Sequence, residues 1–327
     1  MVPGAKTLLP VLLAILLAGC EAKLRLDGVE ATKAQPVRRT DQFQSAVGSE
    51  QALVAVASHG VVVASTDHGK TWRRHDLAGW PSLIDIDRCP DGQLVALSYE
   101  REIWLAPAEG SSWERRPIDT KETPQALTCD PTGRIWVVGS FSTFLSSNDR
   151  GATWQSQSLD QDLLLTTIQF LDADHAVSTG EFGTVATTGD GGKTWRQLDP
   201  IPEEFYPADT WFRDTQRGWS VGLQGRIYGT RDGGASWQLE PTPTLAPLYS
   251  LAGVNGAPYA VGGEGVVLRL DGDQWKEVRY NEPSHSYLRA LAPAGNELMV
   301  AGGAGSLRLL DLAASAAAPT QHEAGQP

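Results

Sequence analysis

Short apolar runs separated by turn residues recur along most of this chain. Examples are LVAVASHGVVVAS from Leu53, IWVVGSFSTFLSS from Ile135 and GWSVGLQGRIYGT from Gly218. Each run contains two apolar strands around a tight turn, and a further strand precedes and follows it. The pattern predicts an all-β fold built from units of four antiparallel strands.

These units recur with a period of about 41 residues. Their outer strands begin at Trp72, Trp113, Trp154, Trp195, Trp237 and Trp275. A small residue that ends an apolar strand marks seven copies, at Ala57, Ser98, Gly139, Gly180, Gly222, Gly262 and Gly302. Units of this length and strand content are propeller blades, so residues 45–312 are predicted to form a seven-bladed β-propeller with four-stranded antiparallel blades.

The last unit ends at SLRLLDL, residues 306–312, before an outer strand can form. The segment KLRLDGVEA, from Lys23 to Ala31, alternates between apolar and polar residues and lies outside the first unit. We therefore expect an N-terminal strand to complete the last blade and close the ring.

Four of the units share one motif between the third and fourth strands. An Asp can accept hydrogen bonds from turn amides, a Gly permits a positive φ, two hydroxyl residues tie the turn together, and a Trp packs on the blade. The Asp could instead be a catalytic acid or a calcium ligand, but four periodic copies cannot all line one active site. The expected structural residues are Ser65, Asp67, Gly69, Thr71, Trp72, Ser147, Asp149, Gly151, Thr153, Trp154, Thr188, Asp190, Gly192, Thr194, Trp195, Thr230, Asp232, Gly234, Ser236 and Trp237.

The N-terminus has the pattern of a secretion signal. An apolar run from Leu8 to Leu17 is too short to span a bilayer and is followed by Ala18, Gly19 and Cys20. Small residues before a Cys resemble the lipobox of bacterial lipoproteins, so residues 1–19 are expected to be removed and Cys20 lipidated. The alternative is an ordinary signal peptide with a coincidental Cys. Residues 20–44 would then be a lipid-anchored segment, and residues 313–327 a disordered Ala-rich tail.

The formal net charge of −12 argues against nucleic acid as a partner, because phosphates would be repelled. Cys89 and Cys129 each precede a turn at a similar place in consecutive units, and they could form a disulfide if their Cα atoms lie within about 7 Å. Neither has a Cys or His at metal-ligand spacing, and no phosphate loop or HExxH motif is present. No metal site and no cofactor are expected.

The repeated motif, Ser/Thr-x-Asp-x-Gly-x-Thr-Trp, is the Asp-box, or bacterial neuraminidase repeat. Together with the glycine-ended strand before GRIYGTRDGGASW, it resembles the propellers of the photosystem II assembly and stability factors. This resemblance implies a non-catalytic seven-bladed scaffold that holds another protein. Relatives in non-photosynthetic bacteria are lipoproteins or exported proteins. Photosynthetic members of this family share a basic surface patch. Here its local counterpart is Arg73, Arg74, Arg115 and Arg116, which lie on outer strands where charge commonly protects a sheet edge.

Two other classes of function stay open. Sialidases share the Asp-box, but the Arg-Ile-Pro signature is absent and the regular repeat lacks the long insertions that build a catalytic pocket. A glycan-binding module would need exposed aromatic residues. We favour a monomeric, lipid-anchored scaffold in the bacterial envelope, facing the periplasm. Its expected partner is a protein, for example a membrane protein or exporter complex, whose assembly it supports. Glu21 after the Cys favours the outer membrane.

Exposed aromatic residues are expected on the face opposite the Asp-boxes. The turns between second and third strands have their tips at His59, Glu100, Phe141, Phe182, Gln224, Glu264 and Ala304. Their sequence varies, and they lie with the loops that enter each blade beside the acids Glu181, Glu203 and Glu204. Alternatively, the rings fold back on their own blades. The candidate partner-binding residues are Trp80, Phe141, Phe182, Phe205, Tyr206, Tyr249 and Tyr287.

Overall fold

The computed structural model describes residues 27–281 and 285–312. The chain divides into two units, residues 1–35 and 36–327. Residues 1–26, which include the expected signal peptide and Cys20, and the expected tail at 313–327 lie outside the described residues. No helix in the described ranges is long and apolar enough to cross a membrane.

The described part of the first unit is a short helix, α2 (Asp27–Lys33). The ammonium of Lys33 donates to Glu30 Oε1 at 3.0 Å, one helical turn away. The expected strand over Lys23–Ala31 is therefore wrong for residues 27–31, and residues 23–26 lie outside the described residues. Ring closure by an N-terminal strand is not confirmed.

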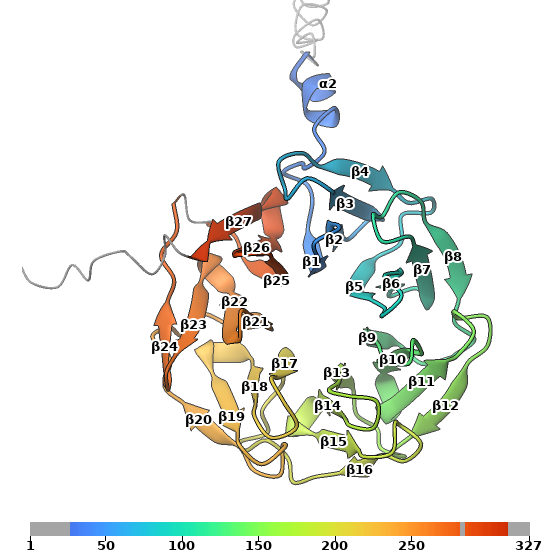
Figure 1. The fold of residues 1–327 in the computed structure, drawn as a ribbon, viewed down its shortest axis with the longest axis vertical. Coiled ribbons are helices and arrows are strands. Elements are labelled where there is room, and N and C mark those ends of the chain that lie inside the picture. The colour runs from blue at the N-terminus through green and yellow to red at the C-terminus, as the bar shows by residue number, and fades with distance from the viewer. Residues whose placement is uncertain (1–26, 282–284, 313–327) are drawn as a thin grey trace, which may run out of the picture. The chain divides into compact units, whose positions relative to one another are not determined.

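The second unit is a ring of seven antiparallel sheets, and this confirms the all-β propeller (Figure 1). In each sheet the strands follow chain order from the axis outwards. The first strand begins at Phe43, two residues before the expected start of the ring. Blades 1 to 4 consist of β1 (Phe43–Gly48), β2 (Leu53–Ala57), β3 (Val61–Ser65), β4 (Arg73–Asp76); β5 (Leu83–Arg88), β6 (Leu94–Ser98), β7 (Glu102–Ala106), β8 (Glu114–Pro117); β9 (Pro124–Cys129), β10 (Ile135–Gly139), β11 (Thr143–Ser147), β12 (Gln155–Ser158); β13 (Leu165–Phe170), β14 (Ala176–Gly180), β15 (Val185–Thr188) and β16 (Arg196–Gln197).

Blades 5 and 6 also have four strands, whereas the described residues of blade 7 provide three. The outer strand of blade 7 is thus the one element of the expected pattern that the described residues do not contain. The strands of these blades are β17 (Asp209–Phe212), β18 (Gly218–Val221), β19 (Ile227–Thr230), β20 (Gln238–Glu240); β21 (Leu248–Val254), β22 (Ala257–Gly262), β23 (Val267–Asp271), β24 (Gln274–Glu277); β25 (Leu288–Ala294), β26 (Glu297–Gly302) and β27 (Leu307–Asp311).

Packing between blades 1 and 7 closes the ring in the described residues. Strand β1 lies against β25, and Phe43 is fully buried in a cluster with Ala290 and Ala301 of blade 7. The amide of Gly305 donates to the carbonyl of Asp41 at 2.9 Å. Apolar burial between neighbouring sheets therefore joins the two ends of the propeller.

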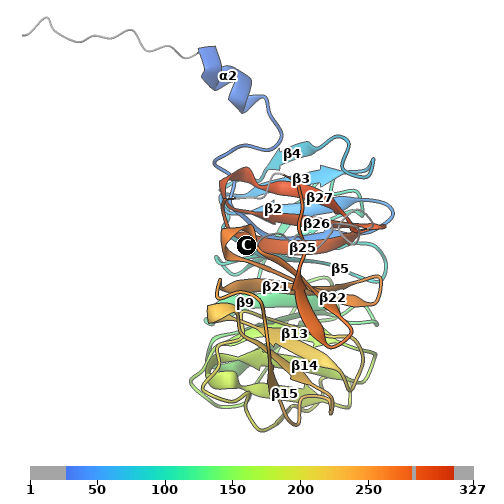
Figure 2. The same ribbon diagram turned by 90° about the vertical axis from the view of Figure 1, so that its left-hand side faces the viewer.

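The strands run from one face of the ring to the other, as the side view shows (Figure 2). Turns between the third and fourth strands lie on one face, which we call the Asp-box face. Turns between the second and third strands, with the loops that enter each blade, lie on the opposite face, which we call the tip face. These two faces present different side chains from the same repeated backbone.

Candidate functional site

The first Asp-box turn is held by hydrogen bonds among its own residues. Asp67 Oδ1 accepts from the Thr71 amide at 2.9 Å and from Ser65 Oγ at 2.8 Å, and Asp67 Oδ2 accepts from Thr71 Oγ1 at 2.6 Å. The amide of Gly69 donates to Ser65 Oγ at 2.8 Å. These bonds, those from Thr71 above all, lower the pKa of Asp67 to about 2. The carboxylate is committed to the turn.

The other three copies repeat this network. Asp149, Asp190 and Asp232 each accept the same three bonds from the equivalent hydroxyl groups and amide. Hydrogen bonds led by those from Thr153 and Thr194 lower the pKa of Asp149 and Asp190 to about 2. The same hydrogen-bond network in four turns supports a structural role for the motif.

The motif's Trp and Gly pack against the neighbouring blade. The ring of Trp195 stacks on Phe144 of blade 3, with centroids 4.1 Å apart, and meets Trp136 edge-on at 6.1 Å. Gly192 has a φ of +77°, and a Cβ there would lie 2.3 Å from the Trp136 ring. The backbone of one Asp-box turn therefore rests directly on the preceding blade, which explains why this position requires glycine.

Cys89 and Cys129 form a disulfide, with Cα atoms 5.0 Å apart. Cys89 follows β5 of blade 2, and Cys129 ends β9 of blade 3. The Cys129 amide also donates to Asp87 Oδ2 at 2.9 Å. The bridge therefore ties two inner strands at their ends on the Asp-box side.

On the tip face, the same turn recurs with left-handed backbone angles. Phe141 has φ 53° and ψ 37°, and Phe182 has φ 57° and ψ 26°. Bulky residues rarely adopt this conformation, so each costs on the order of 1 kcal/mol of backbone strain. In blade 2, Arg101 rather than Glu100 has the positive φ. Five of these turns are 3₁₀ turns, at Ser140–Ser142, Glu181–Gly183, Leu223–Gly225, Gly263–Gly265 and Gly303–Gly305.

Large apolar side chains that are exposed gather on the tip face. Trp80 is 74% exposed, Phe182 62% and Phe141 55%, so these rings do not fold back on their blades. Of the nine exposed large apolar residues in the described ranges, Val29 in α2 and Leu239 in β20 lie elsewhere. The remaining seven are Trp80, Tyr99, Phe141, Phe182, Tyr206, Leu223 and Leu245.

Three members of this set escaped the sequence reasoning. Tyr99 and Leu223 are the first residues of their turns, and Leu245 lies in the loop that enters blade 6. Comparison of all three residues in each turn, rather than the central one alone, would have found Tyr99 and Leu223. Leu245 carried no such signal, because the entering loops differ in length.

Phe205 was wrongly expected to be exposed. It is only 5% exposed, and its ring meets Tyr228 edge-on with centroids 4.9 Å apart. A Cβ on Gly222 would lie 2.7 Å from the Phe205 ring, so the ring covers the end of β18. This aromatic residue belongs to the core between blades 4 and 5.

Tyr249 and Tyr287 are half-buried and meet edge-on, with centroids 6.2 Å apart. The Tyr287 hydroxyl donates to Gln42 Oε1 at 2.6 Å, and Tyr249 faces the axial channel. These two residues join neighbouring blades as much as they offer a surface.

The acids beside these aromatic residues are partly engaged. Glu181 Oε2 accepts from the Leu164 amide at 2.9 Å, and Glu203 forms an ion pair with Arg226 at 2.7 Å. Two of the three acids beside the aromatic residues are therefore held by their own surroundings, Glu181 by a backbone amide and Glu203 by an arginine.

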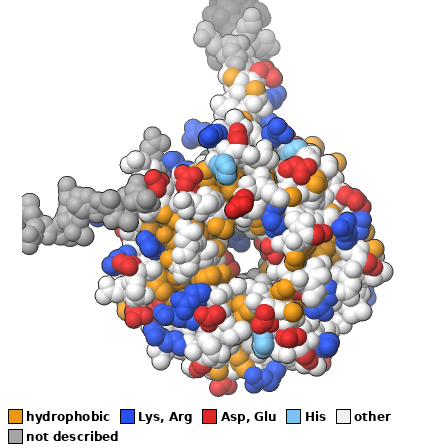
Figure 3. Space-filling view, viewed as in Figure 1, with side chains coloured by type: hydrophobic (Ala, Val, Ile, Leu, Met, Phe, Trp, Pro, Cys, Tyr) orange, Lys and Arg blue, Asp and Glu red, His pale blue; other side chains and the backbone are white. Residues whose placement is uncertain are grey.

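A channel of about 760 Å³ follows the axis and opens in the hollow at the centre of the face in Figure 3. Asp85 Oδ2 accepts from the Leu127 amide of blade 3 at 2.8 Å, and Asp209 Oδ2 from the Leu251 amide of blade 6 at 2.8 Å. Burial in the channel wall raises the pKa of Asp85 to about 7 and that of Asp209 to about 6, although these bonds oppose the shift. Both carboxyls tie blades together.

The four arginines on the outer strands do not form a free basic patch. Arg74 pairs with Asp41 at 2.8 Å and with Asp76 at 2.8 Å. Arg115 pairs with Glu102, and Arg116 with Glu114. Of the four, Arg73 has no ion pair within the described part of the chain. No group of three or more metal-ligating side chains occurs in the ranges that the structure describes.

Fold and turns together define a seven-bladed Asp-box propeller. Comparison with known proteins shows which propellers it is similar to. The sequence model of a family described as "Photosynthesis system II assembly factor YCF48" matches residues 105–204. A photosystem II assembly lipoprotein Ycf48 of Synechococcus sp. (strain CC9902) is 27% identical, over 62% of this chain and 63% of that protein. The Ycf48 assembly protein of Synechococcus sp. (strain JA-3-3Ab) is 26% identical over 53% of each chain. The chain is a Ycf48-like propeller that spans about half to two-thirds of the length of these relatives.

Solved structures agree on the architecture. A structure titled "YCF48 bound to D1 peptide" superposes with a TM-score of 0.67 at 15% identity, over 84% of this chain and 93% of that one. Virginiamycin B lyase from Staphylococcus aureus superposes with a TM-score of 0.75 at 12% identity, over 84% and 96%. Because a protein named as bound to a peptide and a lyase share this fold, these superpositions concern architecture alone.

Proposed function

We propose that this chain is a non-catalytic, lipid-anchored scaffold that holds a protein partner on its tip face during assembly or support of an envelope complex. The observation that carries the proposal is the concentration of exposed large apolar side chains on that one face. Contiguous exposed apolar groups rimmed by polar ones are typical of protein interfaces, in which aromatic residues supply most of the binding energy.

The strained turns support the same function. Phe141 and Phe182 lie on adjacent blades and hold a left-handed backbone that glycine would adopt more easily. Neither ring contributes to the core, since both are more than half exposed. An unfavourable residue without a packing role is best explained by contact with another molecule.

The matched relatives support assembly rather than catalysis, since their names describe assembly proteins. The described axial carboxylates support it too, because Asp85 and Asp209 are occupied by backbone amides of neighbouring blades. We expect no turnover of sialosides or related glycosides by the purified protein. Turnover that is lost on substitution of an axial Arg or Tyr would contradict this expectation.

Anchoring at Cys20 follows from the apolar run that ends in LLAGC, and relatives named lipoproteins support it. We propose attachment of the mature chain to the periplasmic side of the outer membrane. Mass spectrometry of the membrane fraction should find an acylated chain that starts at Cys20, and Cys20→Ala should release the protein or leave it unprocessed. A soluble chain that retains Gly19 would contradict the anchor.

The decisive experiment removes both rings, in the variant Phe141→Ala with Phe182→Ala. Crosslinked partners are captured from envelope membranes, identified, and then titrated as purified proteins. We expect affinity for the partner to fall by about 2 kcal/mol or more, with an unchanged midpoint of urea unfolding.

Leu239→Ala is the matched control, because Leu239 is also exposed but lies on outer strand β20. It should leave binding unchanged. If the double variant binds like wild type, or if Leu239→Ala weakens binding equally, the tip face is not the partner site.

A further inference from the structure

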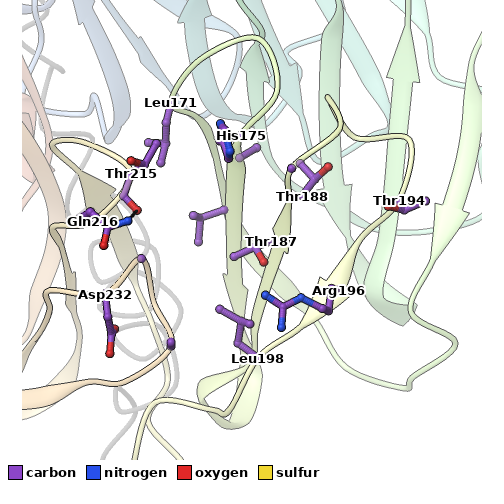
Figure 4. Close-up of a pocket in the computed structure, with 15 residues that line it drawn as sticks. Leu171, His175, Thr187, Thr188, Thr194, Arg196, Leu198, Thr215, Gln216 and Asp232 are labelled. Atoms are coloured by element: carbon purple, nitrogen blue, oxygen red, sulfur yellow. Dashed lines mark hydrogen bonds between the residues drawn. The ribbon is translucent and has the colours of Figure 1, made fainter.

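A second cavity lies on the Asp-box face, between blades 4 and 5 (Figure 4). Its volume is about 460 Å³, within the range of small-molecule sites. Leu171, Val177 and Leu198 supply apolar walls, and Arg196 of β16 extends its guanidinium into the space. Asp232 and Gln216 of blade 5 lie across the cavity.

At one position of the repeat, blade 4 has a smaller side chain than the two blades beside it, a valine as in blades 1 and 2. Trp136 of β10 pairs with Ser146 of β11, and its equivalent in blade 4 is Val177, which pairs with Thr187 of β15. Blade 5 again has a tryptophan, Trp219, at this position. The indole of blade 3 is almost completely buried under the Asp-box turn of blade 4. Blade 4 presents an isopropyl group in its place.

The stacking partner of the indole is replaced as well. Arg134 lies 5.1 Å from the Trp136 ring centroid, and Arg217 lies 5.2 Å from that of Trp219. The equivalent residue in blade 4 is His175, which interacts with Asp172 at 2.9 Å and lines the cavity. Blade 4 therefore lacks both halves of the stacked pair that its two neighbours possess.

The charge in the cavity comes from another position. Arg196 pairs across the sheet with Thr187, and its guanidinium forms no hydrogen bond or ion pair with any residue between 27 and 312 that the structure describes. Glutamine stands at the equivalent positions, Gln155 in blade 3 and Gln238 in blade 5. Across the cavity, Asp232 is held by its own turn through Ser236. The guanidinium is thus the positively charged group available to an anionic ligand.

We propose that this cavity binds an aromatic carboxylate, whose ring occupies the space that an indole fills in blade 3 and whose carboxylate pairs with Arg196. Apolar walls favour the ring, and the planar guanidinium matches a carboxylate in a bidentate geometry. A free aromatic acid and the carboxyl end of a chain that finishes in an aromatic residue share this chemistry. The site lies on the face opposite the proposed partner surface and is independent of it.

Isothermal titration calorimetry with indole-3-propionate tests the site, with indole-3-propionamide as the neutral comparison. We expect saturable binding of the acid with a dissociation constant of about 0.1–1 mM, as suits a ligand of this size. The amide should bind at least tenfold more weakly, since it lacks the charge that Arg196 recognises. Equal binding of the two compounds, or no saturable binding of the acid, would overturn the proposal.

Two variants make blade 4 resemble its neighbours. Arg196→Gln installs the residue of blades 3 and 5 and should weaken binding of the acid about tenfold or more. Val177→Trp should fill the cavity and abolish binding. Arg73→Gln, at the equivalent position of blade 1, is the control and should bind like wild type. Unchanged affinity in Arg196→Gln would overturn the site even if Val177→Trp fails to fold.

A tripeptide, acetyl-Gly-Gly-Trp, distinguishes the two sources of this chemistry. If it binds as tightly as indole-3-propionate and its amidated form does not, the cavity accepts a chain end. If indole-3-propionate binds and the tripeptide does not, the cavity selects a small molecule. Either result supports the aromatic carboxylate site, whereas equal binding of the free and amidated tripeptides contradicts it.

Discussion

The two faces of the ring are built from the same repeat but differ in what varies. On the Asp-box face, four turns have the same residue types and the same hydrogen bonds around Asp67, Asp149, Asp190 and Asp232. On the tip face, the backbone repeats with a positive φ while side chains change from Phe141 to Glu264 to Ala304. Where folding needs particular atoms, the sequence repeats. Where only the backbone is constrained, side chains are free to serve binding.

The largest expected effect follows loss of an Asp-box Trp. Trp195→Ala removes the stack on Phe144 and the edge contact with Trp136, and should lower the free energy of unfolding by about 3–5 kcal/mol. Urea unfolding followed by circular dichroism measures it. Binding by the tip face should change only through the unfolded fraction. A cost below about 1 kcal/mol would mean that the motif's Trp is not a packing residue.

The disulfide should come next. The double variant Cys89→Ser with Cys129→Ser opens a covalent loop between two blades. Its free energy of unfolding should be about 2–4 kcal/mol lower than that of the oxidised wild-type protein. The expected measurement is a lower midpoint of urea unfolding, and treatment of wild type with a reductant should reproduce it. If reduction and substitution both leave the midpoint unchanged, the bridge does not stabilise the ring.

A smaller effect distinguishes the turn carboxylates by pH. Because the pKa of Asp190 is lowered from 3.8 to about 2 in the folded chain, its stabilising contribution is complete above pH 4 and is lost as pH falls through 2. Asp190→Asn should therefore be less stable than wild type at pH 6, and the difference should shrink towards pH 2. Unfolding curves at several pH values test this. A difference that does not depend on pH would contradict the charged turn.

The smallest effect is expected on the tip face. Phe141→Gly relieves the left-handed backbone but frees the unfolded chain, and these opposing terms should leave stability within about 1 kcal/mol of wild type. The opposite exchange on the Asp-box face, Gly192→Ala, should destabilise clearly because the new Cβ meets Trp136. If Phe141→Gly unfolds the protein and Gly192→Ala does not, the comparison between the two faces is reversed.

Much of the ring could be predicted because the strands of each blade follow one another along the chain. The Trp period and the small strand-ending residues predict seven blades and the position of each Asp-box turn. Phe141 and Phe182 could be placed at exposed tips because tight turns fix where a side chain emerges. Phe205 could not, because its longer loop gives no register, and only the packing on Tyr228 shows that its ring is buried.

The repeated sequence by itself determined the sheets, their turns and the hydrogen bonds within each turn, since these join residues close along the chain. Tertiary structure decided what happens between blades. Helix α2 occupies residues for which alternation predicted a strand, because alternation alone does not provide a strand with a partner. The cavity beside Arg196 lies where blade 4 has Val177 and meets blade 5, whereas blades 3 and 5 have an indole at that position. Its shape depends on packing between blades, which no local pattern specifies.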